Sequence, residues 1–336
     1  MNLLVYFAII LVCAAVWYIT RIFELAAEMR GVKQYEVNDK DNKLNGRLML
    51  WFMIAFFAFC FWQYFKYKDK FLPVAASEEG VELDWLLDFN FIIVIVVFLI
   101  TNFVLFYFAY KYAGKKGNVA TYYPENHRLE LAWTVIPGCV LAVIIFLGLK
   151  SWTKITREPD ASEKYSLIEL YGQQFNWTAR YSGDDNTLGE TNYKLVGGSN
   201  ALGVDSLSKD AWDDFIVADT IHIQVGLRVK FVLRSQDVIH SAFFPHFRQQ
   251  MNCVPGMKTM LHFVPTITTD SMRLITHNPD FNYILLCNKI CGASHYNMQK
   301  VIIVDNAARY KAWYEKKKLA VIFSGKSVKT TAELQH

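Results

Sequence analysis

Cys287-Asn288-Lys289-Ile290-Cys291-Gly292-Ala293-Ser294-His295-Tyr296-Asn297-Met298 carries two thiols, one imidazole and one thioether within twelve residues. Such short spacing lets one loop bring all four side chains to a single point. Soft sulfur ligands favour copper or zinc over hard cations such as magnesium. A second histidine, His240, lies upstream in Asp237-Val238-Ile239-His240-Ser241, after an apolar, β-branched run. The two segments together predict a metal site.

The make-up of this ligand set narrows the choice of metal. A structural zinc site takes four ligands and rarely includes methionine. A blue-copper site takes one cysteine, two histidines and a distant methionine, so a second cysteine would have no role there. Two thiolates that bridge two copper ions would use every one of these groups. A disulfide between Cys287 and Cys291 is the plain alternative, but it leaves the spacing of the histidine and methionine unexplained.

The pattern Cys-x-x-x-Cys-Gly-x-x-His-x-x-Met, placed after Asp-Val-Ile-His-Ser, resembles the dinuclear copper (CuA) centre of cytochrome c oxidase subunit II. In that family the two cysteines bridge the coppers, and each copper takes one histidine. A methionine and one backbone carbonyl complete the two coordination spheres. The resemblance therefore implies a dinuclear copper cofactor held by His240, Cys287, the carbonyl oxygen of Lys289, Cys291, His295 and Met298. It also implies a cupredoxin sandwich as the fold of the metal domain.

The composition indicates a membrane protein with one further domain. The chain has 336 residues, of which 53% are hydrophobic and 15% aromatic, and this is too apolar for an ordinary soluble protein. The net charge of +4 is small and predicts neither a nucleic-acid partner nor a polyanionic substrate. Cys13, Cys60 and Cys139 lie in apolar runs and are expected to pack as small hydrophobic residues. Cys253 is expected to be a buried thiol outside the ligand set.

Four apolar stretches are long enough to cross a membrane, which takes about 20 residues. They lie at roughly residues 3–22, 48–65, 85–110 and 129–149. The first has no basic segment before it and no small-residue cleavage site after it. We therefore expect it to be a retained anchor and not a cleaved signal peptide.

The charges of the connecting segments predict the orientation of these spans. The first connection, residues 21–47, and the third, residues 111–128, are rich in lysine and arginine. The second connection, residues 66–84, carries three lysines but also five acidic residues. By the positive-inside rule the first and third connections lie in the cytoplasm. We expect a multi-pass protein of the bacterial inner membrane, with the copper domain and both termini in the periplasm.

The third and fourth spans extend the resemblance. Asn126-His127-Arg128-Leu129-Glu130-Leu131-Ala132-Trp133 is similar to the start of the second helix in the subunit II hairpin, here residues 85–152. The resemblance implies that Glu130 lies at the mouth of a proton channel of the catalytic subunit. The alternative is a helix-start charge favoured by the helix dipole. Residues 1–70 have no place in the usual two-helix pattern, so we expect an added N-terminal hairpin that packs on a partner subunit.

Residues 160–305 are expected to form the cupredoxin domain. Short strands separated by turns are typical of a sandwich or barrel. The expected strands lie at 166–171, 172–181, 221–225 and 229–233 (both within 216–235), 258–264, 272–276, 283–286 and 301–304. The polar stretch 183–214 is expected to be an inserted surface excursion. Residues 306–336 are expected to form a C-terminal amphipathic helix, over 306–318, and a loose tail from Ser324.

Two positions depart from the family pattern. Gly172–Trp177 is similar to the family motif Gly-x-Gln-Trp-x-Trp, whose first tryptophan accepts electrons from cytochrome c, but Phe175 stands at that place. We keep Phe175 and Trp177 as candidates for the point where electrons enter, and a plain surface aromatic at 175 stays an alternative. The family has a magnesium-binding glutamate where this chain has Lys289. Lysine cannot bind magnesium, so we expect that contribution to be absent or replaced.

The resemblance implies an electron-transfer subunit of a haem–copper terminal oxidase, with no oxygen-reducing site of its own. Its expected donor is a cytochrome c or a haem c domain, free or in a supercomplex. Its other expected partners are catalytic subunit I, further oxidase subunits and membrane lipid. A quinol oxidase subunit is disfavoured because every copper ligand is present. The copper subunit of a nitric oxide reductase, and a copper-storage or assembly protein, remain alternatives.

Overall fold

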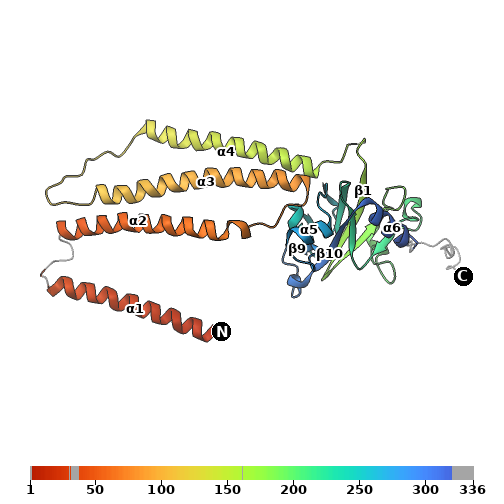
Figure 1. The fold of residues 1–336 in the computed structure, drawn as a ribbon, viewed down its shortest axis with the longest axis horizontal. Coiled ribbons are helices and arrows are strands. Elements are labelled where there is room, and N and C mark those ends of the chain that lie inside the picture. Colours follow the sequence, from red (N-terminus) through yellow and green to blue (C-terminus); the bar gives the residue numbers. More distant parts are fainter. Residues whose placement is uncertain (1, 30, 32–37, 161, 320–336) are drawn as a thin grey trace. The chain divides into compact units, whose positions relative to one another are not determined.

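The computed structural model describes residues 2–29, 31, 38–160 and 162–319 (Figure 1). The chain divides into two units. The first comprises residues 1–71 and 92–132, and the second comprises 72–91 and 133–336. The loose tail expected from Ser324 lies outside the described residues.

Four helices precede the β-domain, and all four are long and apolar enough to cross a membrane. They are α1 (Asn2–Met29), α2 (Asp39–Tyr67), α3 (Glu78–Lys111) and α4 (His127–Thr156). Each helix extends beyond the apolar stretch that predicts it. The start of α3 shows why, because Ser77 accepts a hydrogen bond from the Gly80 amide at 2.9 Å and so caps a polar first turn. Hydropathy alone detects no helix in such a turn.

In the first unit, α2 packs against the part of α3 that belongs to that unit. Phe52 lies 5.4 Å from Phe106, and Phe56 lies 5.8 Å from Phe98, measured between ring centroids. Near the start of α2, a methyl group on Gly46 would lie 3.3–3.5 Å from atoms of α3 and the residues after it, so the absent side chain permits close packing. The second helix of the added N-terminal segment thus joins the hairpin directly.

The β-domain in the second unit is a sandwich of two five-stranded sheets. One sheet has the order β3-β2-β1-β5-β8 and the other has the order β4-β10-β9-β6-β7. The strands are β1 (Tyr165–Gln173), β2 (Asn176–Tyr181), β3 (Phe215–Val217), β4 (Ile221–Gln224), β5 (Arg228–Ser235), β6 (His240–Phe244), β7 (Gln249–Cys253), β8 (Thr259–Phe263), β9 (Tyr283–Cys287) and β10 (Gln299–Asp305). β1 pairs with β5 in parallel, and β10 pairs with β4 in parallel; the other pairings are antiparallel.

The core lies between the two sheets and is rich in aromatic side chains. Phe231 of β5 and Phe244 of β6 meet across the sandwich with ring centroids 5.1 Å apart, and both are fully buried. Phe263 of β8 stacks on Phe247, which follows β6, at 4.6 Å. Each such buried ring contributes about 1.5–3 kcal/mol of hydrophobic free energy. This packing holds β6, which carries His240, in a rigid frame.

The strand predicted over residues 272–276 is wrong, because this segment is part of helix α5 (Thr269–Ile275). Thr268 caps the helix by accepting a hydrogen bond from the Ser271 amide at 3.2 Å. The negative charge of Asp270 in the first turn interacts favourably with the positive end of the helix dipole. Met272 of the same helix is buried. The capping residues decide the local structure here, and a short apolar pattern cannot distinguish a strand from a helix.

The inserted segment, residues 183–214, folds onto the outer face of the first sheet. Leu202, Val204 and Ala211 bury themselves against Tyr171 of β1. A polar cluster lies beside them, in which Arg180 of β2 bonds to Asp214 at 2.9 Å. The segment therefore has a small core of its own.

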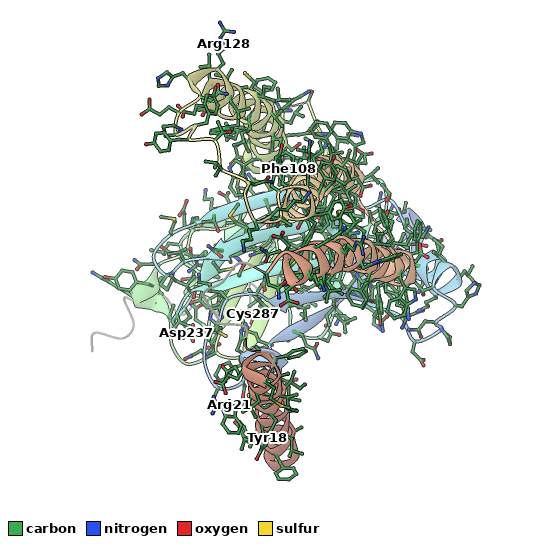
Figure 2. The ribbon with its side chains drawn as sticks, turned by 90° about the vertical axis from the view of Figure 1, so that its left-hand side faces the viewer. Tyr18, Arg21, Phe108, Arg128, Asp237 and Cys287 are labelled. Atoms are coloured by element: carbon green, nitrogen blue, oxygen red, sulfur yellow. The ribbon has the colours of Figure 1, made fainter. Side chains whose placement is uncertain are left out.

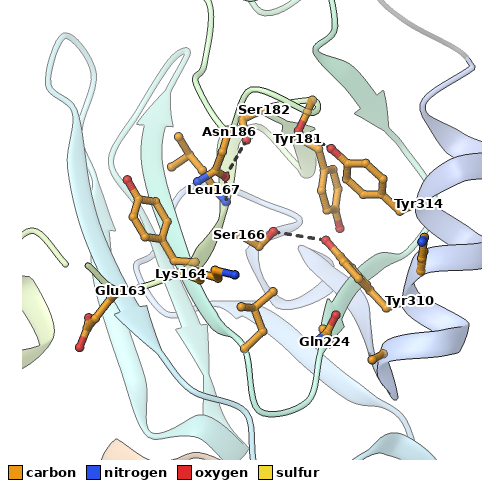
Figure 3. A pocket seen from close by; sticks show the side chains of 15 residues that line it. Glu163, Lys164, Ser166, Leu167, Tyr181, Ser182, Asn186, Gln224, Tyr310 and Tyr314 are labelled. Atoms are coloured by element: carbon orange, nitrogen blue, oxygen red, sulfur yellow. Dashed lines mark hydrogen bonds between the residues drawn. The ribbon is translucent and has the colours of Figure 1, made fainter. Parts of the chain in front are cut away.

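The C-terminal helix α6 (Ala307–Lys317) packs on the edges of both sheets through its aromatic side chains. Trp313 stacks on His222 with ring centroids 4.4 Å apart, and it lies 5.2 Å from Tyr181. A hollow of about 740 Å³ separates part of α6 from β1. Figure 3 shows this hollow, with the hydroxyl groups of Ser166 and Tyr310 3.2 Å apart. Its lining includes none of the predicted metal ligands.

Candidate metal centre

Two adjacent strands bring the predicted ligands together. β6 begins at His240 and β9 ends at Cys287, and the two strands are antiparallel neighbours. The chain then turns through residues 287–298, which we call the metal loop, before β10 begins. The Cys287 amide donates to the Met298 carbonyl oxygen at 3.0 Å, which closes the base of the loop. Figure 2 marks Cys287 and Asp237 in this part of the β-domain.

The Cys287 sulfur lies among three of the predicted donors. It is 3.8 Å from Nδ1 of His240 and 3.3 Å from the Lys289 carbonyl oxygen. It is 3.9 Å from the Cys291 sulfur, and both cysteines are free. That separation is far longer than the roughly 2.05 Å of a disulfide bond.

The Cys291 sulfur has a matching set of neighbours. It lies 3.5 Å from Nδ1 of His295 and 3.8 Å from the Met298 sulfur. Each thiol thus has one histidine nitrogen and one further donor beside it, with the two sulfurs between the two sets. The structure brings all six predicted donor groups to one place.

The centre is largely shielded from water. His240 is 0% exposed, Cys287 8%, Cys291 5% and Met298 1%. His295 is only partly buried, and the tip of the loop exposes Ile290 and Tyr296. Access from solvent is therefore on the His295 side.

Asp237 fixes the orientation of the His240 ring. Its Oδ1 lies 2.8 Å from Nε2 of His240, so Nε2 carries the proton and Nδ1 faces the sulfurs with its lone pair. Although burial alone would raise the pKa of Asp237, hydrogen bonds from the Gln174 amide and from His240 lower it overall. A methyl group on Gly172 would lie 3.1 Å from the His240 ring, so glycine allows β1 to approach it closely.

Gln174 links the two ligand-bearing segments. Its amide donates to Oδ2 of Asp237 at 2.8 Å, and its side chain donates to the Cys291 carbonyl oxygen. Neither Gln174 nor a supporting role for Asp237 follows from the ligand spacing. An acid three residues before a ligand histidine is the one local signal that indicates such support.

The two aromatic candidates for electron entrance lie in different environments. Phe175 is half-buried, and a methyl group on Gly292 would lie 2.9 Å from its ring. Phe175 therefore rests on the metal loop next to Cys291. Trp177 is fully buried and meets His240 edge to face, with ring centroids 5.9 Å apart. Of the two, only Phe175 has a surface that a partner could contact.

The thiols must lose protons before they can bind a metal. Burial, reinforced by the neighbouring Cys287, raises the pKa of Cys291 to about 11. Metal binding at such a site releases protons, so affinity rises with pH. Cys253 lies opposite His240 in the β6–β7 pairing, outside the donor cluster, and burial raises its pKa to about 12.

The other predicted residues, and the buried His246, lie apart from the donor cluster. The Lys289 side chain is exposed, in contrast to its inward-facing carbonyl oxygen. Glu130 is in the first turn of α4 with its carboxylate 3.3 Å from Nδ1 of His127. His246 packs against Phe281 with ring centroids 5.0 Å apart, and burial lowers its pKa to about 4.

Comparison with family models matches most of the chain to two adjoining domains. Residues 62–151 match the model described as cytochrome C oxidase subunit II, transmembrane domain. Residues 167–306 match the model described as cytochrome C oxidase subunit II, periplasmic domain. The second match contains the metal loop and His240.

Individual proteins show the same likeness. The alternative cytochrome c oxidase subunit 2 of Bradyrhizobium diazoefficiens is 32% identical over 240 residues, covering 70% of this chain and 81% of that protein. Cytochrome c oxidase subunit 2 of Cereibacter sphaeroides is 24% identical over 252 residues, covering 72% and 78%. The periplasmic domain of subunit II of cytochrome oxidase from Bradyrhizobium japonicum, a crystal structure, is 20% identical with a TM-score of 0.33, covering 48% of this chain and 99% of that one.

Proposed function

The chain belongs to the cytochrome c oxidase subunit II family, and from that premise we propose that its donor cluster holds two copper ions. The protein is an electron-transfer subunit of a haem–copper oxidase, within an oxidoreductase complex. The family binds copper, and a histidine and two cysteines of the cluster lie within 4.8 Å of one another. The relatives are oxidase subunits, so the nitric oxide reductase alternative is not favoured.

The two matching donor sets carry the proposal of a dinuclear site. The Cys287 sulfur adjoins His240 Nδ1 and a carbonyl oxygen, and the Cys291 sulfur adjoins His295 Nδ1 and a thioether. A single tetrahedral ion would leave two donors unused. When bound, copper would supply one-electron redox chemistry. The chain's own part is to hold the donors in one geometry, exclude water and orient the His240 ring through Asp237.

Electrons are proposed to enter through Phe175 from a cytochrome c or a haem c domain, free or in a supercomplex. Support comes from the half-buried Phe175 ring, which rests on Gly292 beside Cys291. Trp177 would act inside the domain, because it is buried against His240. We further propose that position 289 supplies no magnesium ligand, because its side chain is an exposed lysine.

The protein is a membrane protein with a periplasmic domain, and its partners include oxidase subunits. We propose the bacterial inner membrane as its location, with both termini in the periplasm. Four spans and the loop charges support this orientation. Catalytic subunit I and membrane lipid are the proposed neighbours, and Glu130 is the proposed proton-channel entrance.

We propose the following division of the chain. Residues 1–70 form the added hairpin and 85–152 the hairpin typical of the family. Residues 160–305 form the copper domain, with the inserted segment at 183–214, and 306–336 form the C-terminal helix and tail. The end of α4 at Thr156, the start of β1 at Tyr165 and the end of β10 at Asp305 support three of these boundaries, whereas α3 begins at Glu78, before residue 85.

Purification of the oxidase with its neighbouring subunits tests the copper proposal. The oxidised complex is expected to be purple and to show the multi-line EPR pattern of one unpaired electron shared by two copper nuclei. A co-purifying c-type haem protein would identify the donor. A colourless, EPR-silent cuprous site would instead indicate copper storage, and a single-copper pattern would contradict the dinuclear assignment.

A further inference from the structure

The first two turns of α3 carry three acidic residues that pair with basic residues of other elements. Glu79 pairs with Arg228 of β5, Glu82 with Lys154 of α4, and Asp84 with Arg248. All these residues belong to the second unit of the chain. The start of α3 is therefore bound both to the β-domain and to the end of the neighbouring helix.

Arg248 makes the most extensive of these links. Its Nε lies 2.7 Å from Oδ1 of Asp84 and its Nη2 lies 3.0 Å from Oδ2, a bidentate pairing that fixes orientation as well as distance. Its Nη1 donates to the Pro245 carbonyl oxygen at 2.7 Å, and its Nη2 also donates to that of Pro73. The guanidinium thus joins its own turn, the segment before α3 and α3 itself.

The backbone at Arg248 is also unusual. Its φ is +56°, a left-handed backbone conformation that residues other than glycine rarely adopt. The turn before it is held by Phe247, which is 1% exposed and stacks on Phe263. The Ala76 amide also holds this turn, because it donates to the His246 carbonyl oxygen at 2.7 Å. The local structure therefore forces the guanidinium toward Asp84.

A second link buries a carboxylate at the same place. Glu79 is 1% exposed, and its Oε1 accepts from Nη1 of Arg228 at 2.9 Å. Its Oε2 accepts from the Val264 amide at 2.9 Å. The paired charges and the backbone bond hold the first turn of α3 against β5 and the residue after β8.

We propose that Arg248 and Asp84 are positioning residues that hold β6, and with it His240, in a fixed position relative to the start of α3. The inference rests on the proposed copper site and extends it to the electron-transfer step. The distance from the copper ligands to the haem in the catalytic subunit decides how fast an electron passes. Because Arg248 follows β6 by four residues, loss of this contact would let β6 and His240 shift against the start of α3 even while the Glu79–Arg228 pair remains.

The test uses the whole oxidase complex with Arg248→Met and, as the milder change, Arg248→Lys. The copper centre is reduced by a flash-excited soluble dye, and haem absorbance reports the onward transfer. We expect Arg248→Met to slow copper-to-haem transfer about tenfold, within the roughly 100-fold loss that a displacement of about 1 Å can cause at a reacting centre. Arg248→Lys keeps one charge but loses the bidentate geometry, so we expect a smaller loss. The dye-to-copper rate and the copper EPR pattern should not change in either variant.

Lys317→Met is the matched control. Lys317 is on α6, away from α3, and the change breaks its pairing with Asp219 at 3.0 Å. Its transfer rates should equal those of the parent protein. An unchanged copper-to-haem rate in both Arg248 variants would overturn the inference. Loss of the copper pattern in Arg248→Lys would overturn it too, because Arg248 would then support the copper site itself. Failure of the copper proposal would appear separately, as the absence of a dinuclear pattern in the parent protein.

Discussion

The metal loop and the inserted segment are two excursions from the same sandwich, and different forces hold them. The metal loop and His240 bring together thiols, imidazoles and a thioether at 3.5–3.9 Å from one another. Sulfur is only a weak hydrogen-bond donor and acceptor. The inserted segment is tied by a buried charged cluster. Arg180 bonds to Glu169 at 2.8 Å and to Asp214 at 2.9 Å, and all three are at most 1% exposed.

The difference shows which region depends on a ligand. The donors of the metal loop satisfy one another poorly and would gain from a metal ion. The buried carboxylate of Asp214 in the inserted segment already has a cation, Arg180, within the chain. Removal of copper should therefore affect the first region and leave the second unchanged, whereas removal of Arg180 should do the reverse.

The largest expected effect follows Cys291→Ser. A hydroxyl group cannot replace a bridging thiolate, so copper affinity should fall by more than about 100-fold, beyond the loss typical for supporting residues. EPR should show no dinuclear pattern. Hydrogen exchange in residues 183–214 should match that of the parent protein. If the variant kept the dinuclear pattern, Cys291 would not be a bridging ligand.

Arg180→Met probes the other side of the comparison. It leaves the carboxylate of Asp214 buried without its cation, while Glu169 keeps its pairing with Arg234 at 2.9 Å. The loss of a buried partner typically costs about 3–5 kcal/mol of unfolding free energy. The midpoint temperature of thermal unfolding of the purified protein should fall. The copper EPR pattern should persist below that temperature.

The control is Lys318→Met, which breaks an exposed pair with Asp184 at 3.1 Å. Exposed pairs contribute about 0–1 kcal/mol, so its unfolding should be nearly unchanged. Equal effects of the two variants would show that burial does not decide the contribution of Arg180.

Lowering the pH should stabilise the fold at the inserted segment and weaken copper binding at the metal loop. Burial raises the pKa of Asp214 to about 6 despite the attraction of Arg180. The folded chain therefore binds this proton more tightly than the unfolded chain, and folding gains as pH falls from about 7 through 6 toward 4. The expected gain relative to an Asp214→Asn variant is about 2 kcal/mol. Copper affinity should decline over the same range, because protons compete with the metal for its ligands.

Unfolding measured in urea at pH 7 and pH 5, with and without copper, separates these two effects. The difference in unfolding free energy between the parent and the Asp214→Asn protein should depend on pH both with and without copper. Copper stabilisation should be larger at pH 7. A parent protein that lost stability relative to Asp214→Asn on acidification would contradict the sign given for Asp214.

Sequence patterns predict the two regions unequally well, for a physical reason. Metal ligands are few and chemically distinctive, so the five donors of the metal loop and His240 can be proposed without coordinates. The order in the inserted segment arises from Arg180 and Glu169, which are on strands outside it and meet Asp214 only in the folded chain. The α5 helix was missed because its cap at Thr268 and its buried Met272 outweigh a short apolar pattern.

Supporting residues lie between these extremes, as Asp237 illustrates. It is three residues from His240 in sequence, yet its effect depends on Gln174 from a distant turn. The start of α3 likewise looks like a polar boundary in the sequence. Only the fold shows that Asp84 and Glu79 meet arginines from β-domain segments far along the chain.

Asp237→Asn should have the smallest effect in the series and the most informative one. The amide can still bond to the Gln174 backbone, but it removes a negative charge that supports the His240 ring. Copper affinity should fall about tenfold, the lower end of the range for such supporting residues. The reduction potential should rise, because the lost charge stabilised the oxidised, more positive state. A redox titration followed by copper absorbance measures this shift, and Asp280→Asn, an exposed acid outside the donor cluster, is the control. If the two variants had the same reduction potential, the Asp237 carboxylate would hold the His240 ring in place without tuning the metal. The dependence of the metal loop on copper would then come from its ligands alone.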